Sequence, residues 1–224
     1  MYRSKSVATA LASVVLGGAA LALAGFALAS NTPHQKSLQC VTDATKANTC
    51  NLSFSSFPDS LAGQHGANGG SHPDWVSYSN QALEVPANTT VNVTIKQYDS
   101  GEALNNNFFA QVMGTVGGTA TVNGVTVTHV DPTKIGHTFT LRGIPGSGSD
   151  IFVNVPLPAD ELGGKVVIGD GEYTQPNVIK FSFKTGSKGV YEWNCEYPCG
   201  GSRQGGFGQA MSSFGYMSGT LTVK

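Results

Sequence analysis

Charged residues are scarce in this chain. Asp, Glu, Lys and Arg make up 12% of its 224 residues, and the net charge is −1; an average soluble protein carries roughly 25% charged residues. Lys and Arg form no cluster, so the electrostatic footprint that nucleic-acid binding requires is missing. We therefore expect no nucleic-acid partner.

The chain also lacks the common motifs of hydrolases and nucleotide-binding proteins. It contains no Gly-x-Ser-x-Gly elbow, no His-Glu-x-x-His pair and no phosphate-cradling glycine loop before a helix. Carboxylates are scattered, and Asp160-Glu161 and Glu196 come nearest to a pair. A hydrolase would therefore have no evident nucleophile.

Helical periodicity is absent as well. No segment of residues 75–224 shows a helix period longer than about two turns. Apolar and polar residues alternate instead, as at 91–95 and 179–183, and Asn123-Gly124 has the composition of a two-residue hairpin turn. This punctuation predicts an all-β domain over 75–224, a sandwich or a barrel.

The N-terminus carries a targeting signal. Arg3 and Lys5 precede the uncharged apolar run 7–29, which ends in a small-x-small motif before Ser30. Residues 1–30 are predicted to be a signal peptide or a membrane anchor, and either would place the remainder outside the cytoplasm. Residues 31–74 are polar and linker-like.

Cysteine and histidine are few. Cys40 and Cys50 enclose a short polar loop and are predicted to form a disulfide, as expected outside the cytoplasm. Cys195 and Cys199 form a Cys-x-x-x-Cys pair whose state is left open. No histidine follows His137.

Four ordered segments resemble a known family. "VPANTTVNV" (85–93), "IGHTFTL" (135–141), "YEWNCEYP" (191–198) and "MSGTLTVK" (217–224) resemble, in this order, segments of cupredoxins, the blue-copper proteins, with ends most like azurin. The resemblance implies a Greek-key β-sandwich. It also implies a copper site with His137, Cys195 and Met217 as ligands, and the carbonyl of Gly136 as a weak axial contact.

The Cys-x-x-x-Cys loop departs from the blue-copper pattern, because Cys199 occupies the slot where cupredoxins place a second histidine. The loop also resembles that of the binuclear CuA domain of cytochrome oxidase subunit II. That resemblance implies bridging thiolates from both cysteines and a carbonyl ligand at Tyr197. The expected His and Met of that family are here Arg203 and Gly206.

Three alternatives follow from this departure. The site holds two copper ions in an atypical binuclear centre, or one copper, or a Cys195–Cys199 disulfide forms in a metal-free module. For a single copper the ligands are His137, Cys195, Cys199 and either Met217 or Met211, with His129 as an extra imidazole.

The resemblance implies an extracytoplasmic, copper-binding electron carrier more than an enzyme. The partner would be a redox protein or respiratory complex outside the cytoplasmic membrane, with the chain secreted or anchored through residues 7–29. The alternatives are a metal-free structural or interaction module and a copper-delivery protein for an oxidase.

Overall fold

The described part of the chain begins after the predicted targeting segment. The computed structural model describes residues 37–58, 75–101, 105–144, 146, 150–169, 171–199, 209–213 and 215–224. The predicted signal or anchor segment 7–29 and much of the predicted linker 31–74 therefore lie outside the described residues. Within these ranges, no helix combines the length and the apolar character that crossing a membrane needs.

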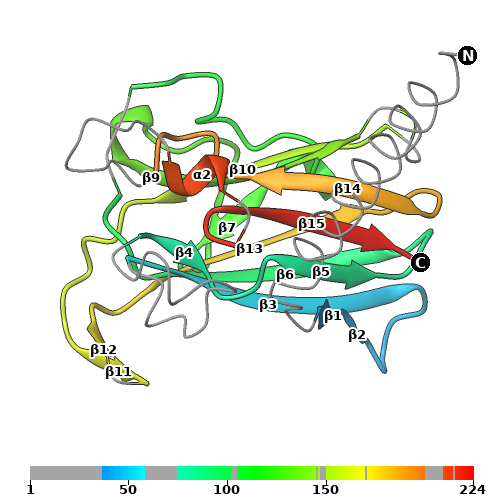
Figure 1. The fold of residues 1–224 in the computed structure, drawn as a ribbon, viewed down its shortest axis with the longest axis horizontal. Helices are drawn as coiled ribbons and strands as arrows, with labels where there is room; N and C mark the ends of the chain where they lie inside the picture. The colour runs from blue at the N-terminus through cyan, green and yellow to red at the C-terminus, as the bar shows by residue number, and fades with distance from the viewer. Residues whose placement is uncertain are drawn as a thin grey trace, which may run out of the picture. The chain divides into compact units, whose positions relative to one another are not determined.

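Two β-sheets make up the domain (Figure 1). The first sheet has the order β1 (Leu38–Gln39), β5 (Ala82–Val85), β15 (Ser218–Val223), β14 (Gly189–Asn194), β9 (Ile135–Gly143), β10 (Phe152–Pro158). The second has the order β2 (Val41–Thr42), β3 (Thr49–Phe57), β6 (Thr90–Gln97), β13 (Asn177–Lys184), β7 (Ala120–Val122), β8 (Val125–Val127).

Short elements complete the domain. The strand β4 pairs with β3, and β11 and β12 form a separate two-stranded ribbon. The remaining bounds are β4 (Ser77–Tyr78), η1 (Val116–Gly118), η2 (Pro132–Lys134), β11 (Val166–Ile168), β12 (Gly171–Tyr173) and α2 (Gln209–Ser212).

The chain crosses repeatedly between the two sheets. The consecutive strands β5 and β6 lie in different sheets, and so do β8 and β9, and β13 and β14. Most neighbours within a sheet are therefore not neighbours in sequence, as in a Greek-key sandwich. The predicted all-β Greek-key sandwich is confirmed.

The predicted alternation places one face of each central strand in the core. On β6, Val91, Val93 and Ile95 are at most 1% exposed, while their neighbours are partly exposed. Because side chains alternate along a strand, this face meets the other sheet. The partners of these residues on β13 are the residues predicted to share a face: Phe183, Phe181 and Ile179.

The predicted hairpin is also confirmed. β7 and β8 pair with Val122 opposite Val125, so Asn123 and Gly124 form a two-residue loop. Both have positive φ, 50° and 85°, which is why this turn favours Asn-Gly.

Part of the predicted linker lies inside a sheet. Residues 49–57 form β3, which runs parallel to β6 along eight paired positions. Cys50, Leu52 and Phe54 are buried. The apolar and polar residues of this strand alternate as well, but the pattern is short, because the fully buried Ser56 takes the inward position after Phe54 in place of an apolar residue.

Cys40 and Cys50 form the predicted disulfide. The bond connects the end of β1 and the start of β2 with β3, so it ties the first described strands to the sandwich.

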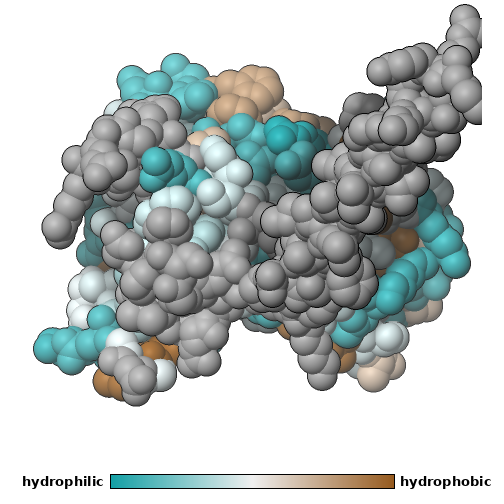
Figure 2. Space-filling view, viewed as in Figure 1, coloured by the Kyte–Doolittle hydropathy of each residue, from teal (hydrophilic) through white to brown (hydrophobic). Residues whose placement is uncertain are grey.

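Large exposed hydrophobic side chains are spread over many elements. Figure 2 shows brown only as separate spots between teal and white surface on the viewed face. Isolated apolar residues of this kind are normal on a protein surface. Those that are more than half exposed are Val41, Phe108, Val125, Leu162 and Val167.

Candidate metal centre

Three predicted site residues meet at one end of the first sheet. The Nδ1 atom of His137 lies 2.8 Å from the Cys199 Sγ and 3.7 Å from the Cys195 Sγ. The two sulfur atoms are 2.7 Å apart, and both cysteines are free. Their exposed fractions are 1% for His137, 0% for Cys195 and 5% for Cys199, so the three donors converge out of contact with water.

Strand register creates this convergence. β14 pairs antiparallel with β9, with Asn194 opposite Thr140, and with β15, with Asn194 opposite Ser218. Cys195 follows directly, and its N–H donates to the Met217 carbonyl at 2.9 Å. The end of β14 therefore delivers Cys195 between the strand that carries His137 and the start of β15.

A main-chain carbonyl of the loop after β14 lies close to both sulfur atoms. The Tyr197 carbonyl oxygen lies 3.4 Å from the Cys195 Sγ and 3.0 Å from the Cys199 Sγ, and it accepts the N–H of Cys199 at 2.7 Å. The N–H of Thr138 donates to the Cys195 Sγ at 3.4 Å. A carbonyl oxygen therefore lies beside the two sulfurs, at the position that the resemblance to the binuclear loop implied.

A chain of buried hydrogen bonds fixes this loop on the sheet. The Glu196 N–H donates to the Thr138 Oγ1 at 2.8 Å, and that hydroxyl is 3.0 Å from the Thr140 Oγ1. The Thr140 hydroxyl donates to the Asn154 Oδ1 at 2.8 Å. Asn154 in turn donates to the carbonyls of Phe109 and Gln111. In this order each hydroxyl donates one hydrogen bond, so the side-chain groups of Thr138, Thr140 and Asn154 all have hydrogen-bond partners.

Aromatic rings pack beneath the sulfur atoms. The Tyr78 ring meets the Trp193 ring edge-on at 5.0 Å, and the Tyr78 hydroxyl donates to the Thr138 carbonyl at 3.0 Å. Burial and then the charges of Cys195 and Cys199 raise the pKa of Tyr78 well above its usual value. Trp193 is fully buried and belongs to the hydrophobic core.

Asp99 is a site residue that the sequence analysis missed. Its Oδ2 lies 2.6 Å from the Nε2 of His137, on the side of the ring away from the sulfur atoms. Asp99 follows the end of β6 and is 38 positions from His137 in sequence. The scattered carboxylates gave no spacing signal, and only the packing of this loop on β9 reveals the pair.

The metal-free site has a defined arrangement of protons. Burial alone would lower the pKa of His137, but the hydrogen bonds to Asp99 and Cys195 and their charges outweigh it and raise the pKa from 6.5 to about 10. Burial tends to raise the pKa of Cys195, yet hydrogen bonds from Cys199 and His137 hold it well below the usual value.

The second thiol behaves in the opposite way. Burial, followed by the hydrogen bond and charge of Cys195, raises the pKa of Cys199 well above the usual value. For Asp99, burial tends to raise the pKa, but the hydrogen bond and charge of His137 lower it overall. These directions favour the protonated form of His137, the thiolate form of Cys195, the thiol form of Cys199 and the ionised form of Asp99.

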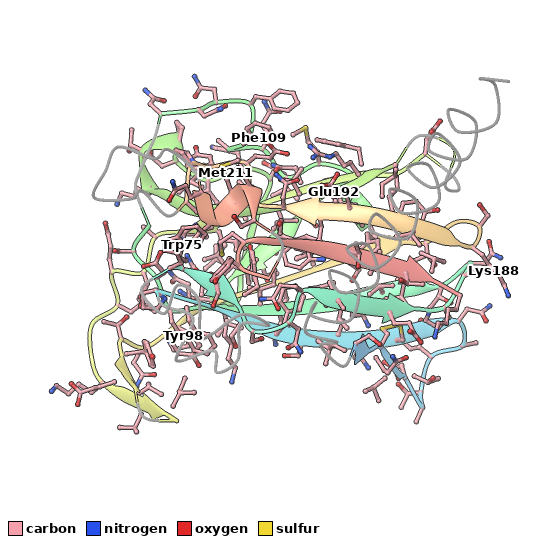
Figure 3. The ribbon with its side chains drawn as sticks, viewed as in Figure 1. Trp75, Tyr98, Phe109, Lys188, Glu192 and Met211 are labelled. Atoms are coloured by element: carbon pink, nitrogen blue, oxygen red, sulfur yellow. A yellow bond between two sulfur atoms is a disulfide. The ribbon has the colours of Figure 1, made fainter. Side chains whose placement is uncertain are left out.

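The other predicted residues lie at different distances from this cluster. Met217 is fully buried, and its main chain adjoins Cys195. Met211 is partly buried on α2, near the tip of the β14 arrow in Figure 3, and its neighbour Ala210 accepts the Met217 N–H. The Gly136 carbonyl oxygen faces Gly101, since a Cβ there would lie 2.6 Å from it.

His129 lies elsewhere on the surface. It is exposed, pairs with Gln111 in an isolated bridge and is not among the three residues whose donor atoms cluster within 4.8 Å of one another. The positions of Arg203 and Gly206 fall outside the described residues.

The donor set fits a soft transition metal. Two sulfur atoms and one imidazole nitrogen lie within 4.8 Å of one another, and all three residues are buried. Sulfur donors select Cu(I), zinc or iron–sulfur clusters, and imidazole suits copper and zinc. The residues present therefore fit copper, with His137 Nδ1, Cys195 Sγ and Cys199 Sγ as the atoms that would hold it.

Comparison with known proteins adds structural neighbours of low similarity. No family profile matches the chain, and no curated protein matches it. Among solved structures it is similar to auracyanin B, with 18% identity over 84% of this chain and 96% of that one and a TM-score of 0.32. Reduced rusticyanin has 13% identity over 80% and 86% of the two chains, with a TM-score of 0.29.

A laccase from Pediococcus acidilactici shares 10% identity over 86% of this chain and 30% of its own, with a TM-score of 0.39. These neighbours are cupredoxins, the family that the ordered sequence motifs resemble. At such TM-scores the similarity supports no further inference, so the chemistry of the site has to follow from its own residues.

Proposed function

We propose that this chain is a copper-binding electron-transfer protein with an atypical ligand set, namely His137, Cys195 and Cys199. The observation that carries the proposal is the convergence of one imidazole nitrogen and two cysteine sulfurs in a buried cluster. Bound copper would supply the one-electron Cu(I)/Cu(II) couple.

Copper suits the surroundings better than zinc does. A structural zinc ion takes four Cys, His or carboxylate ligands, whereas the cluster offers three and Asp99 is engaged with the far side of the His137 ring. A fourth ligand would come from the thioether of Met217 or Met211, or from the Tyr197 carbonyl oxygen beside the two sulfurs. A thioether is a ligand that copper accepts.

The protein's own groups prepare the site. The proton on Nδ1 of His137 and the proton on Cys199 have to leave before all three donor atoms are free, so copper binding is expected to release protons. The strands β9 and β14 hold His137 and Cys195 on one rigid sheet, which limits rearrangement between oxidation states. The aromatic core and the loop after β14 exclude water.

The location and partner remain part of the proposal. The chain would act outside the cytoplasm, secreted or anchored through residues 7–29, and pass electrons to a redox protein or respiratory complex. The Cys40–Cys50 disulfide supports an oxidising compartment.

Copper titration of the thiol-reduced protein tests the proposal. We expect uptake of one or two copper ions per chain and, after oxidation, an intense visible absorption from thiolate–Cu(II) bonds. Failure to take up copper with both thiols free would refute it. Reversible uptake of Cu(I) with no stable Cu(II) form would instead indicate copper delivery.

One observation favours a second candidate, a metal-free module. The sulfur atoms of Cys195 and Cys199 are 2.7 Å apart, so thiol–disulfide exchange with an external disulfide, which would itself be reduced to two thiols, could join them. Thiol counting on protein purified without reductant separates the candidates, since two free thiols support copper and none supports the disulfide.

A further inference from the structure

We propose that Asp99 is a positioning residue of the metal centre: it holds the His137 ring so that Nδ1 faces the two sulfurs, and it adds negative charge to the ligand. The inference rests on the proposed copper site and assigns a role to a residue outside its ligand set.

The geometry of the ring carries the first step. The two nitrogens of His137 are used at opposite sides, with Nδ1 at 2.8 Å from the Cys199 Sγ and Nε2 at 2.6 Å from the Asp99 Oδ2. When Nε2–H donates to Asp99, the nitrogen left to bind a metal is Nδ1. A carboxylate in this place fixes both the tautomer and the ring orientation, and raises the basicity of the ligand nitrogen.

Asp99 is itself held in place. The carboxylate accepts the N–H groups of Ser100 and Gly101, and its main-chain oxygen accepts the Gln97 side chain and the Asp160 N–H, both at 3.0 Å. Two contacts therefore hold the carboxylate and two hold the main chain that carries it, which leaves Asp99 little freedom to move away from the ring.

A close approach of two glycines sets the distance between the segment after β6 and the strand β9. Gly101 has a φ of +62°, and a Cβ on it would lie 2.4 Å from the Cα of Gly136. The segment after β6 therefore lies directly against the residue before His137. Any larger side chain at position 101 would push Asp99 away from the ring.

Burial separates this ion pair from the others in the described residues. The side chains of His137 and Asp99 are 2% and 15% exposed, whereas each of the other four pairs has at least one partner that is 46% exposed or more. Exposed ion pairs contribute little to stability, because water screens their charges. The charge of a buried carboxylate is screened less, so Asp99 has a stronger electrostatic effect on the His137 ring.

Three substitutions at this position test the role. In Asp99→Ala the acceptor is lost, and we expect the affinity for Cu(I), measured by competition with a chromophoric chelator, to fall about 10- to 100-fold. In Asp99→Asn the amide oxygen still accepts Nε2–H but the negative charge is lost. We expect this variant to bind Cu(I) more tightly than Asp99→Ala and to have a higher reduction potential than the wild type. Asp99→Glu keeps the charge and should restore the potential more than the affinity.

Glu196→Gln is the matched control for charge. Glu196 adjoins Cys195 in sequence, but its carboxylate pairs with Arg142 and does not touch His137. A through-space effect of charge predicts a rise of the potential in both variants, larger for Asp99, which contacts the ring, than for Glu196. The positioning role predicts a loss of Cu(I) affinity in Asp99→Ala that Asp99→Asn largely restores and that Glu196→Gln does not cause.

The outcomes separate this inference from the proposed function. Folded, copper-loaded Asp99→Ala with wild-type affinity and potential would overturn the role of Asp99 while leaving the copper site intact. If Asp99→Ala does not fold, equal potentials in Asp99→Asn and wild type would overturn it instead. Absence of copper uptake by the wild type would refute the proposed function, and with it this inference.

In that last case the ring contact can still be measured without metal. The Nε2–H proton of His137 in the metal-free wild type should be slow to exchange and shifted downfield in NMR spectra, and it should be lost in Asp99→Ala. Its absence from the wild type would contradict the geometry itself.

Discussion

Two cysteine pairs occupy the same chain in opposite states. Cys40 and Cys50 are ten positions apart and bonded, at the edge where β1, β2 and β3 meet. Cys195 and Cys199 are four positions apart, buried and free, although their sulfurs lie 2.7 Å from each other. Proximity of the sulfur atoms therefore does not by itself distinguish a structural disulfide from a site.

The surroundings of each pair make the difference. Within the described residues, the only group of three or more potential metal ligands is His137 with Cys195 and Cys199. This pair has an imidazole, a carbonyl and a backbone N–H directed at its sulfurs, whereas the first pair closes a short loop beside paired strands. Polar groups that converge on the sulfur atoms indicate a binding site, whereas a short closed loop beside paired strands indicates a structural disulfide.

The largest effect is expected from Cys195→Ser. The variant loses the thiolate that accepts hydrogen bonds from His137 and Thr138. We expect copper affinity to fall by more than about 100-fold, which exceeds the loss typical for a residue that contacts a ligand but not the metal. The visible absorption should vanish. The double variant Cys40→Ser/Cys50→Ser should keep the absorption, and a coloured Cys195→Ser protein would remove Cys195 from the ligand set.

Removing the Cys40–Cys50 disulfide is expected to have the opposite result, a loss of stability with little change in copper affinity. Loss of the Cys40–Cys50 bond should lower the free energy of unfolding by about 3 kcal/mol, because the open loop gains conformational freedom in the unfolded chain. Urea unfolding of the metal-free protein measures it. Copper affinity in the folded state should change little, and a large loss would mean that the two regions are coupled.

The hydrogen-bond chain that holds the second pair can be broken with one substitution. Thr138→Val keeps the shape of the side chain but leaves the Glu196 N–H without its acceptor, at a cost of about 1–2 kcal/mol. We expect weaker copper binding as well, since the loop carries Cys199. Unchanged stability and affinity would show that this chain does not support the loop.

The smallest effects should distinguish the two candidate methionines. Met217→Leu and Met211→Leu each conserve volume and should cost less than about 1.5 kcal/mol in stability. A shift in the reduction potential and spectrum is expected for Met217→Leu alone, because its main chain adjoins Cys195. If both variants keep the spectrum and the potential of the wild type, neither thioether is a ligand.

Much of the fold could be predicted because its strands and its hairpin follow regular local patterns. Alternation placed Val91, Val93 and Ile95 on one face, and Asn123-Gly124 defined its own hairpin, since both signals depend on residues close in sequence. His137, Cys195 and Cys199 were candidates because the segments that carry them resemble the ligand segments of a known family.

The features that were missed all depend on contacts between distant segments. The strand β3 is stabilised by its parallel partner β6 and not by its own weak apolar pattern. Asp99 resembles any loop carboxylate until its segment packs against Gly136. The Thr138–Thr140–Asn154 chain needs two paired strands to exist at all.

Local chemistry in the amino-acid order was enough to predict the all-β class, the hairpin and the Cys40–Cys50 bond, because each follows from neighbours along the chain. The candidate ligands followed from the family resemblance. Which of those candidates meet, and which carboxylate contacts the imidazole ring, were decided only in the folded domain. There, strand register and burial bring groups from separate sequence segments within hydrogen-bonding distance.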